Sequence, residues 1–245
     1  MPTLHVVIPC FNEKRTLEPC IRRICSVQWN AGWDVQLIVV DDNSSDESVN
    51  VARALAEEFQ NIEVVTHSQN QGKGSSVREG MSLATSRGSG EDLLVIQDAD
   101  LEYDPNDLPG MVDLFLADKS TGAAVGDRFD RGRRQSQLGR KHKVINRSLT
   151  RLSNLFTGLK LHDMECCYKM MRLEVARLIL PELTEDRFGI EPQIAAVLSR
   201  KHVVTKNHLV RYNPRTIQQG KKIGLRDGFR AVYVILKEAV ARGRE

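Results

Sequence analysis

Apolar runs of strand length alternate with helical patterns along the first hundred residues of the chain. The runs are rich in β-branched side chains, and the stretches between them place apolar residues on one helical face. The expected strands are 4–9, 35–42, 62–67 and 92–97, and the expected helices are 16–28, 46–59 and 72–86. Strands and helices in this order predict an α/β fold with a mostly parallel central sheet and helices on both sides.

The composition suits one globular unit. The chain has 245 residues, of which 41% are hydrophobic and 27% charged, so we expect a single domain over 1–245. The five cysteines are odd in number and lack CxxC spacing, which is typical of reduced thiols in a cytosolic protein. A net charge of +3 is too small to indicate nucleic acid as a partner. Neither a secretory signal nor an apolar run of about 18 residues is present, so no transmembrane segment is expected.

Polar clusters follow four expected strands at the point where each strand ends. The clusters are 9–13, 41–46, 98–100 and 127–128, the last after an expected strand at 122–126. In open α/β sheets, ligands bind beyond the carboxyl ends of the strands, so the clusters are expected along one edge. A solvated loop or a helix cap explains any one cluster, but a binding site explains all four together.

The stretch LLVIQDADLEYDP (93–105) is the most specific of these signals. Four carboxylates follow the apolar run closely: Asp98, Asp100, Glu102 and Asp104. Because like charges repel, the stretch predicts a positive partner. Oxygen-only ligands suit Mg²⁺ or Mn²⁺, which bind through one or two carboxylates plus substrate phosphates. Acids that are simply solvated after a strand are the structural alternative.

Basic residues elsewhere in the chain supply what phosphate oxygens need. They are Arg128, the 131–143 loop, Arg215, Lys221 and Lys222. The chain has no GxxxxGK[ST] loop, and no GxGxxG turn follows the first strand, so neither an NTPase nor a dinucleotide oxidoreductase is expected. The residues therefore predict a site for a metal-bridged diphosphate.

Eight successive motifs resemble those of family 2 glycosyltransferases, in particular the dolichyl-phosphate mannose synthase group of polyprenyl-phosphate glycosyltransferases. The motifs are VVIPCFNE, VVDDNSSDES, NQGKGSSVREGM, VIQDADLEYDP, GDRF, DMECCYKMMR, RFGIEPQI and YNPRTIQQGKKIGLRDG. The resemblance runs from about residue 4 to residue 238, and the last motif favours polyprenyl-phosphate acceptors. It implies the GT-A fold of nucleotide-diphospho-sugar transferases.

The resemblance also implies roles for the donor side of the site. The residues that match nucleoside-binding positions are Pro9, Phe11, Glu13, Val40 and Asp42. Asp98 and Ala99 match donor-binding positions of the DAD motif. Asp100 matches its metal ligand, and Glu102 is a second metal contact where the mannose synthases often carry Gln.

Basic residues take the phosphate roles that the resemblance implies. Arg215 and Lys221 match a late basic pair that neutralises the leaving phosphate. Arg128 matches the arginine of a GSR motif, although Asp127 replaces the usual Ser. Together with Arg140 of the basic loop, Arg128 is expected to hold the acceptor phosphate in line. Asp100 and Arg128 are the residues expected to be catalytic.

These roles imply an inverting, metal-dependent transfer of a hexose to a polyprenyl or dolichyl phosphate, with mannose from GDP-mannose as the favoured donor. A lipid phosphate is already ionised, so the transfer needs no strong base. One alternative is transfer to a sugar or protein hydroxyl, which needs a base such as Asp163 or Glu191. A non-catalytic sugar-nucleotide-binding partner is the other alternative.

The stretch 225–244 predicts an amphipathic C-terminal helix. Its apolar face comprises Leu225, Phe229, Val232, Tyr233, Leu236 and Val240. Such a helix either packs on the sheet domain or lies in a membrane interface. With the basic segment 128–147, it favours peripheral contact with the cytoplasmic face of a membrane or with a membrane subunit. Residues 130–143 are expected to form a mobile loop that orders over bound substrate.

Overall fold

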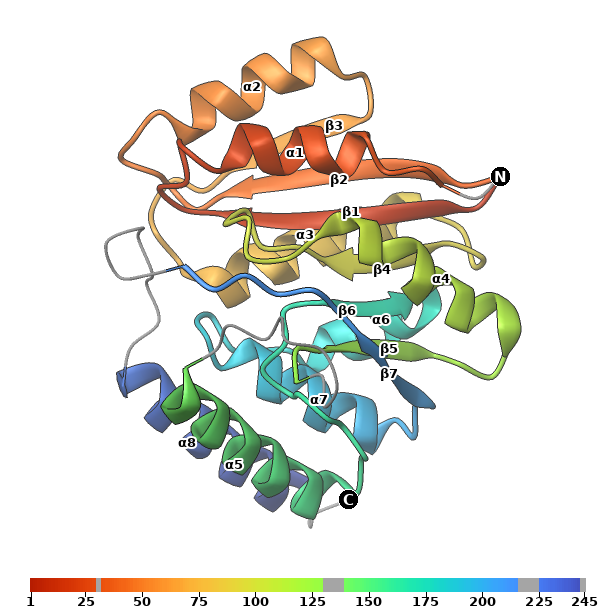
Figure 1. The fold of residues 1–245 in the computed structure, drawn as a ribbon, viewed down its shortest axis with the longest axis vertical. Helices are drawn as coiled ribbons and strands as arrows, with labels where there is room; N and C mark the ends of the chain where they lie inside the picture. Colours follow the sequence, from red (N-terminus) through yellow and green to blue (C-terminus); the bar gives the residue numbers. More distant parts are fainter. Residues whose placement is uncertain (30–31, 130–138, 216–224, 243–245) are drawn as a thin grey trace.

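Seven strands form one sheet in the order β3-β2-β1-β4-β6-β5-β7 in a computed structural model of the chain (Figure 1). The structure describes residues 1–29, 32–129, 139–215 and 225–242. The strands are β1 (Thr3–Cys10), β2 (Asp34–Asp41), β3 (Ile62–Thr66), β4 (Leu93–Ile96), β5 (Ala123–Asp127), β6 (Lys169–Arg172) and β7 (Thr205–Leu209). Strand β6 runs antiparallel to β4 and β5, and the other pairs of this sheet are parallel. The predicted mostly parallel sheet is confirmed.

Helices surround the sheet (Figure 1). They are α1 (Leu17–Cys25), α2 (Ser48–Glu58), α3 (Lys73–Arg87), α4 (Leu108–Ala117), α5 (Arg140–Thr157), α6 (Leu173–Ile179), α7 (Ile190–Arg200) and α8 (Leu225–Arg242), with short 3₁₀ turns at Pro105–Asp107 and Leu180–Glu182. Helix α3 packs against β1 and β2, while α7 packs against α5 and α8. Every residue of β4 is buried, as expected for a strand that is covered on both faces.

The predicted elements differ from the structure mainly at their ends. Helix α1 ends at Cys25, whereas the periodicity predicted a helix to residue 28. The predicted loop 130–143 is wrong over its last four residues, because α5 begins at Arg140. Apolar and polar side chains alternate at helical spacing along α5, and this pattern begins within the segment whose basic charge had suggested a loop. Residues 130–138 lie outside the described part of the chain.

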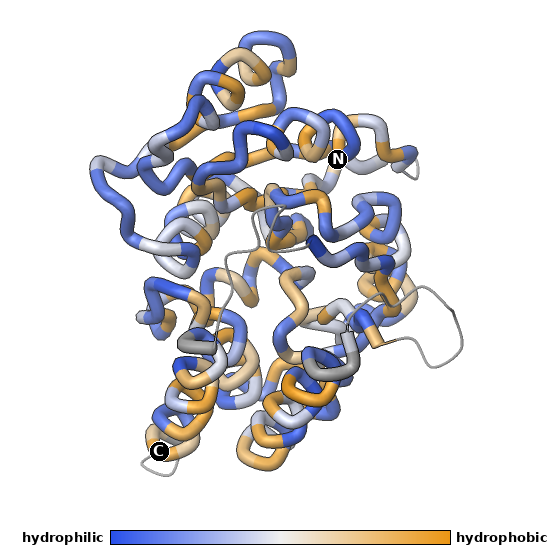
Figure 2. Tube along the Cα trace, turned by 60° about the vertical axis from the view of Figure 1, so that its left-hand side comes forward, coloured by the Kyte–Doolittle hydropathy of each residue, from blue (hydrophilic) through white to orange (hydrophobic). Residues whose placement is uncertain are grey.

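Helix α8 packs through a different face from the one that the sequence predicted. Ala231, Val234 and Ile235 are buried where α8 meets α5 and α7. Much of the predicted apolar face is exposed instead, with Phe229 77% and Val240 61% accessible. Figure 2 shows hydrophobic turns along this helix as far as the C-terminus. The helix carries two apolar stripes, and only one of them faces the domain. None of the helices in the described ranges is both long and apolar enough to cross a membrane.

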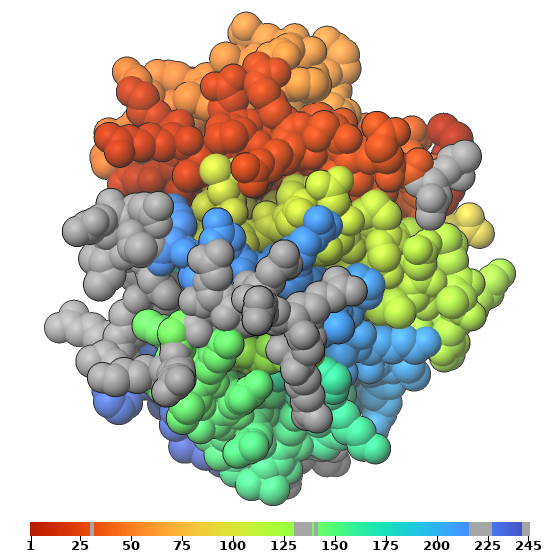
Figure 3. All heavy atoms as spheres, in the orientation of Figure 1, coloured from red at the N-terminus to blue at the C-terminus, as the bar shows by residue number. Residues whose placement is uncertain are grey.

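The segment after β7 returns across the surface between the N-terminal half of the chain and α5 (Figure 3). An isolated antiparallel bridge pairs Tyr103 with Tyr212, and the N–H of Asn213 donates to the carbonyl of Glu102 at 2.8 Å. The rings of Tyr103 and Tyr212 also pack with centres 5.1 Å apart. These contacts fix the segment beside the residues that follow β4, and they bring Arg215 to the same place.

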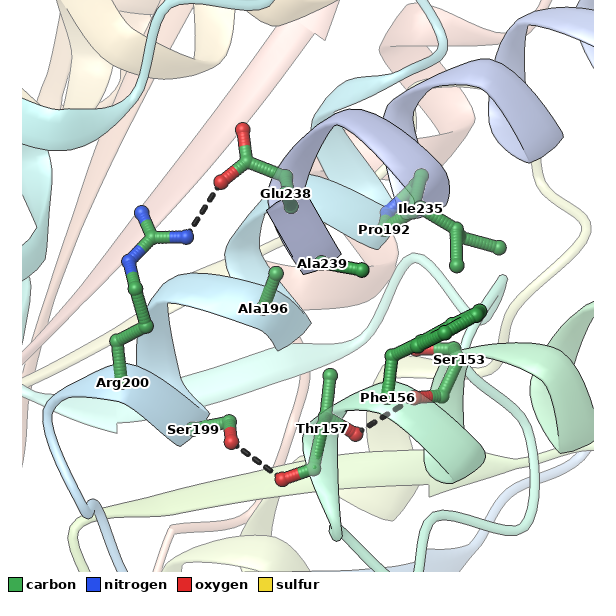
Figure 4. A pocket seen from close by; sticks show the side chains of 10 residues that line it. All are labelled: Ser153, Phe156, Thr157, Pro192, Ala196, Ser199, Arg200, Ile235, Glu238 and Ala239. Carbon is green, nitrogen blue, oxygen red and sulfur yellow. Dashed lines mark hydrogen bonds and ion pairs between the residues drawn. The ribbon is translucent and has the colours of Figure 1, made fainter. Parts of the chain in front are cut away.

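A buried polar network anchors α8 on α7 (Figure 4). Arg200 Nη1 donates to Glu238 Oε2 at 2.5 Å, and Gln193 Nε2 donates to Glu238 Oε1 at 2.8 Å. The Oε1 atom of Gln193 accepts the N–H groups of Thr184 and Glu185, both at 2.8 Å. Because Glu238 is only 6% exposed, its carboxylate depends on these two donors.

Replacement of Glu238 by Ala should therefore lower the free energy of unfolding by about 2–3 kcal/mol, since Arg200 and Gln193 lose a buried partner. Glu182 still pairs with Arg200 at 2.8 Å. The loss of stability is therefore smaller than for a buried arginine that keeps no carboxylate partner. Urea denaturation measures the effect, with Glu57→Ala on the exposed face of α2 as the control. Equal destabilisation by the two substitutions would contradict this role for Glu238.

Candidate active site

The loops that follow β1 and β2 are bound to each other. Asn12 Oδ1 accepts the N–H of Ser45 at 2.7 Å and the N–H of Asp46 at 3.2 Å. Asn12 and Asn43 both have positive φ, 52° and 57°, a conformation that Asn tolerates better than most residues. Because the parallel strands end at one edge of the sheet, these turns form one wall of a site there.

Asp42 fixes the turn that leads into α3. Its carboxylate accepts the N–H groups of Gln71 and Gly72 at 2.7 Å each and the side-chain amide of Asn70 at 2.8 Å. His67 Nδ1 lies 2.8 Å from Asp42 Oδ1. The predicted nucleoside-binding residue thus has an internal structural role. Among the other expected donor-side residues, Pro9 and Phe11 are half-buried, while the side chains of Val40 and Ala99 are enclosed.

Three carboxylates converge on the guanidinium of Arg215. Its Nη1 is 2.9 Å from Glu13 Oε2 and its Nη2 is 3.1 Å from Asp100 Oδ2. Its Nε lies 3.7 Å from Glu102 Oε1, the longest of the three contacts. The backbone N–H of Arg215 donates to the same Glu102 oxygen at 2.8 Å, and the hydroxyl of Tyr212 donates to Glu102 Oε2. The structure therefore brings three predicted site residues, from the turns after β1 and β4, around the guanidinium of a fourth, Arg215, in the segment after β7.

Backbone strain lies at the centre of this cluster. Leu101, between Asp100 and Glu102, has φ of 62°. A bulky side chain rarely adopts this left-handed conformation, which is costly and persists where the surrounding structure enforces it. In this turn the N–H of Glu102 donates to Asp100 Oδ1 at 3.1 Å. The strained residue thus holds the two expected metal ligands together.

The cluster has an excess of negative charge. Burial, and then the charges of Asp98 and Glu102, raise the pKa of Asp100 to about 7 although Arg215 opposes the shift. No group of three or more His, Cys, Asp or Glu side chains in the described ranges is arranged to hold a metal by itself. Mg²⁺ and Mn²⁺ commonly take one or two protein carboxylates and fill their coordination with phosphate and water oxygens. Asp100 and Glu102 fit that partial donor set.

Lys73 is a residue of this site to which the sequence motifs gave no role. Its Nζ lies 2.8 Å from Asp98 Oδ1 and 2.8 Å from Glu191 Oε1. Burial disfavours the charged ammonium, but the two carboxylates outweigh burial and raise the pKa of Lys73. Gly72 precedes it with φ of 101°, and a Cβ there would lie 2.4 Å from the carbonyl oxygen of Asp186. The Gly-Lys-Gly turn was the signal available in the sequence.

Arg128 and Asp163 form a closed ion pair. Arg128 Nε lies 2.5 Å from Asp163 Oδ2, and Nη2 lies 2.8 Å from Oδ1. Asp163 is fully buried, and the ring centre of Tyr212 is 5.0 Å from the guanidinium carbon of Arg128. Arg128 therefore lies at the predicted edge, but its charge is already neutralised. Arg140 is the first residue of α5, and Lys221 lies outside the described residues.

Glu165 is a half-buried acid near this ion pair to which the sequence motifs gave no role. Its Oε1 atom is enclosed without a hydrogen-bond partner in the described structure. Burial, and then the charge of Glu191, raise the pKa of Glu165 to about 7. The charges of Lys169 and Arg128 oppose the rise in the Glu165 pKa only in part. The Lys169 ammonium donates instead to the carbonyl oxygens of Met164 at 3.0 Å and Cys166 at 2.5 Å.

Comparison with known proteins gives a consistent family match. The family described as Glycosyl transferase family 2 matches residues 5–180. A dodecaprenyl-phosphate galacturonate synthase of Rhizobium johnstonii is 29% identical over 72% of this chain and 49% of its own length. An undecaprenyl-phosphate 4-deoxy-4-formamido-L-arabinose transferase of an Enterobacter species is 31% identical over 84% of this chain and 59% of its own length. The chain thus spans about half the length of these curated relatives.

Solved structures match over nearly the whole chain. Glucosyl-3-phosphoglycerate synthase from Mycobacterium tuberculosis in complex with uridine diphosphate has a TM-score of 0.69 at 21% identity, covering 98% of this chain and 80% of that one. The complex with Mn²⁺, uridine diphosphate and phosphoglyceric acid has a TM-score of 0.69 at 19% identity, covering 97% and 78%. At such identities, the likeness establishes the fold.

The raised pKa of Glu165 predicts a pH-dependent stability difference. Between its ordinary value of 4.5 and about 7, the folded chain binds a proton that the unfolded chain releases, so stability falls as pH rises through this window. Glu165→Gln should therefore be roughly 1–3 kcal/mol more stable than the wild type at pH 8, with a smaller difference at pH 5.

Urea denaturation at the two pH values checks this, with Glu57→Gln as the control for loss of one exposed carboxylate. A Glu165→Gln chain that is less stable than the wild type at pH 8 would show that the charged carboxylate is stabilised in the fold, contrary to this account.

Proposed function

Because the chain belongs to glycosyl transferase family 2 and has the GT-A fold, we propose that it transfers a sugar from a nucleoside diphosphate to the phosphate of a polyprenyl lipid. The observation that carries this proposal is the convergence of Glu13, Asp100 and Glu102 on one cationic group, the Arg215 guanidinium, at the carboxyl ends of β1 and β4. The names of the two curated relatives, which contain dodecaprenyl phosphate and undecaprenyl phosphate, support the lipid acceptor.

The acidic cluster suits a divalent metal that is brought with a diphosphate. Asp100 and Glu102 would hold Mg²⁺ or Mn²⁺, which supplies positive charge for the diphosphate leaving group. Structures of the glucosyl-3-phosphoglycerate synthase with Mn²⁺ and with Mg²⁺ support such a metal. Arg215 lies against the same carboxylates, so its guanidinium is placed to share the phosphate charge.

The acceptor chemistry fits the pairing of Asp163. In the transfer, an acceptor phosphate oxygen attacks the anomeric carbon, and the bond from that carbon to the diphosphate oxygen breaks with its electron pair on the diphosphate. A phosphate oxygen is already ionised, so no proton is removed and one displacement inverts the anomeric centre. A hydroxyl acceptor would need a free base. Both oxygens of Asp163 are held by Arg128, so this carboxylate is not a free base, which favours a phosphate acceptor. Glu191 Oε1 is held by Lys73, and Glu191 Oε2 is enclosed without a partner among the described residues.

The sugar is the finer part of the proposal. The sequence motifs favour mannose from GDP-mannose. The curated relatives are instead named for galacturonate and for 4-deoxy-4-formamido-L-arabinose. We therefore keep GDP-mannose as the first donor to test and nucleoside diphosphates of galacturonate and of 4-deoxy-4-formamido-L-arabinose as its rivals.

Exposed apolar residues near the C-terminus supply a membrane contact in this proposal. The outward stripe of α8 comprises Phe229, Tyr233, Leu236 and Val240. These positions follow one face of the helix, and α5, which packs beside α8, exposes Val144 and Leu155 as well. An amphipathic helix with such a face binds at the boundary between lipid headgroups and acyl chains. The acceptor phosphate lies at that boundary, so we propose peripheral contact with the cytoplasmic face of an anionic membrane.

The transfer should require a divalent metal and Asp100. Radiolabelled sugar nucleotides incubated with isoprenyl phosphates should give a chloroform-soluble product. EDTA should abolish the reaction, and Asp100→Asn should lower its rate by about a hundredfold or more, because charge on the leaving group is no longer stabilised. Asp104→Asn is the matched control, since Asp104 turns away to pair with Arg211 at 2.8 Å.

Full turnover after verified removal of metal would contradict the metal role. A product with hydroxyl acceptors but none with isoprenyl phosphates would contradict the lipid-phosphate acceptor while leaving the family assignment intact.

The exposed stripe of α8 should mediate weak membrane binding. The wild type should float with anionic liposomes at low salt, and the combined substitutions Phe229→Ser and Val240→Ser should reduce the floated fraction. Leu116→Ser on α4 is the control, because Leu116 is 57% exposed but lies on another helix. Equal flotation of the wild type and the α8 variant would contradict docking through this face.

A further inference from the structure

A hollow with both charged and apolar lining residues lies at the same end of the sheet as the acidic cluster. It has a volume of about 710 Å³, and its walls include the ends of β5 and β7 and one face of α5. Asp127 at the end of β5 is the register partner of Leu209 at the end of β7. Strands β4, β5 and β7 run in the same direction, so this hollow and Asp98 lie at the same level. Adjacent strands are about 4.8 Å apart, which places the hollow roughly 10–15 Å from Asp98 along the edge.

The two arginines of this hollow have no carboxylate partner among the described residues, and the lining Asp127 pairs instead with His162. Arg147 and Arg151 are exposed, lie one turn apart on α5 and line the hollow together. Neither forms an ion pair or a hydrogen bond with any residue that the structure describes. The three basic residues of the acidic site differ, because Lys73, Arg128 and Arg215 each contact a carboxylate. Two unpaired guanidinium groups on one wall of a hollow are suited to an anion with several oxygens.

The other walls are fixed in place and partly apolar. The Phe129 ring centre is 5.3 Å from the guanidinium carbon of Arg147 and 6.0 Å from that of Arg128. His162 Nδ1 lies 2.9 Å from Asp127 Oδ2, and the N–H of His162 donates to Asn207 Oδ1 at 2.9 Å. These contacts hold the imidazole and the amide at the rim. The Phe129 ring thus lies between Arg128, which pairs with Asp163, and Arg147 of the hollow.

We infer that Arg147 and Arg151 bind the phosphate of the acceptor, a phosphate monoester with an apolar tail. Arg128 was the sequence-based candidate for this task, but Asp163 already neutralises it. The phosphate of the acceptor would lie against the two guanidinium groups, and its tail would leave past Leu209 and Val144, which are 55% and 64% exposed. The separation from Asp98 leaves room for the transferred sugar between donor and acceptor. This assignment rests on the proposed function, because that function supplies the lipid phosphate.

Calorimetric titration of the whole chain with farnesyl phosphate tests the inference. The wild type should bind this probe, and the combined substitutions Arg147→Ser and Arg151→Ser should weaken binding by about tenfold or more, since two charge-assisted contacts are lost. Both side chains are exposed, so the melting temperature should not change. The control carries Arg23→Ser and Arg53→Ser, two exposed arginines on α1 and α2, and should bind like the wild type.

Further probes separate the sources of binding. Farnesol, which has the tail without the phosphate, should not bind, and glycerol phosphate and inorganic phosphate should bind more weakly than farnesyl phosphate. Farnesyl phosphate binding that survives loss of both arginines would overturn the inference. Soluble phosphates that bind as tightly as farnesyl phosphate would overturn the lipid assignment.

A parallel titration keeps this inference separate from the proposed function. The wild type and the double variant should both bind nucleoside diphosphate with Mn²⁺ equally well. If neither binds it while farnesyl phosphate still binds through the two arginines, the donor assignment fails and the anion site stands.

Discussion

Repulsion among carboxylates at the ends of β1 and β4 is the constraint on which the rest of the structure depends. Glu13, Asp100 and Glu102 lie within 2.9 to 3.7 Å of one guanidinium. That guanidinium belongs to Arg215, which is 202 positions from Glu13 in the sequence. The positive charge that the turns after β1 and β4 need therefore comes from the segment after β7, and the same contact ties that late segment to the turn after β1. The raised pKa of Asp100 shows that the compensation is incomplete, which leaves the cluster receptive to a further cation.

The basic residues on the two sides of the site differ in whether they are paired with carboxylates. On the donor side, the cations are already paired with carboxylates, as Lys73 is with Asp98 and Glu191. An incoming metal and diphosphate would add charges of both signs, and the metal would offset the excess of negative charge that remains around Asp100. On the α5 side, Arg147 and Arg151 have no carboxylate partner in the described part of the chain, so an anion that arrives without its own cation is better accommodated there. The sugar-nucleotide donor binds together with a metal cation, whereas the phosphate acceptor brings none. We therefore place the donor at the acidic cluster and the acceptor beside α5.

Local patterns in the sequence predicted the structural features that depend on residues close together in the chain. Alternating apolar runs located the parallel strands, and the acids after residues 93–96 located the edge of the sheet that carries the site. Partnerships across the fold were not predictable, because the spacing of Lys73 or Tyr212 in the sequence says nothing of Glu191 or Glu102. The direction of β6 is likewise set by its neighbours rather than by its own residues. Helix α8 shows what periodicity cannot predict. The helix has two apolar stripes, and the sequence pattern alone does not determine which of them packs against the domain. The buried Glu238 lies on the stripe that packs there.

The central claim is that these carboxylates form an incomplete metal site that the diphosphate of the donor completes. Titration of the chain with Mn²⁺, followed by electron paramagnetic resonance of the free ion, tests it with and without GDP or UDP. Because Arg215 occupies the carboxylates in the free chain, Mn²⁺ should bind weakly alone and at least about tenfold more tightly with a nucleoside diphosphate that binds the chain. Mn²⁺ affinity that is equally high without any nucleotide would show that the protein supplies a complete metal site by itself, and would contradict the account.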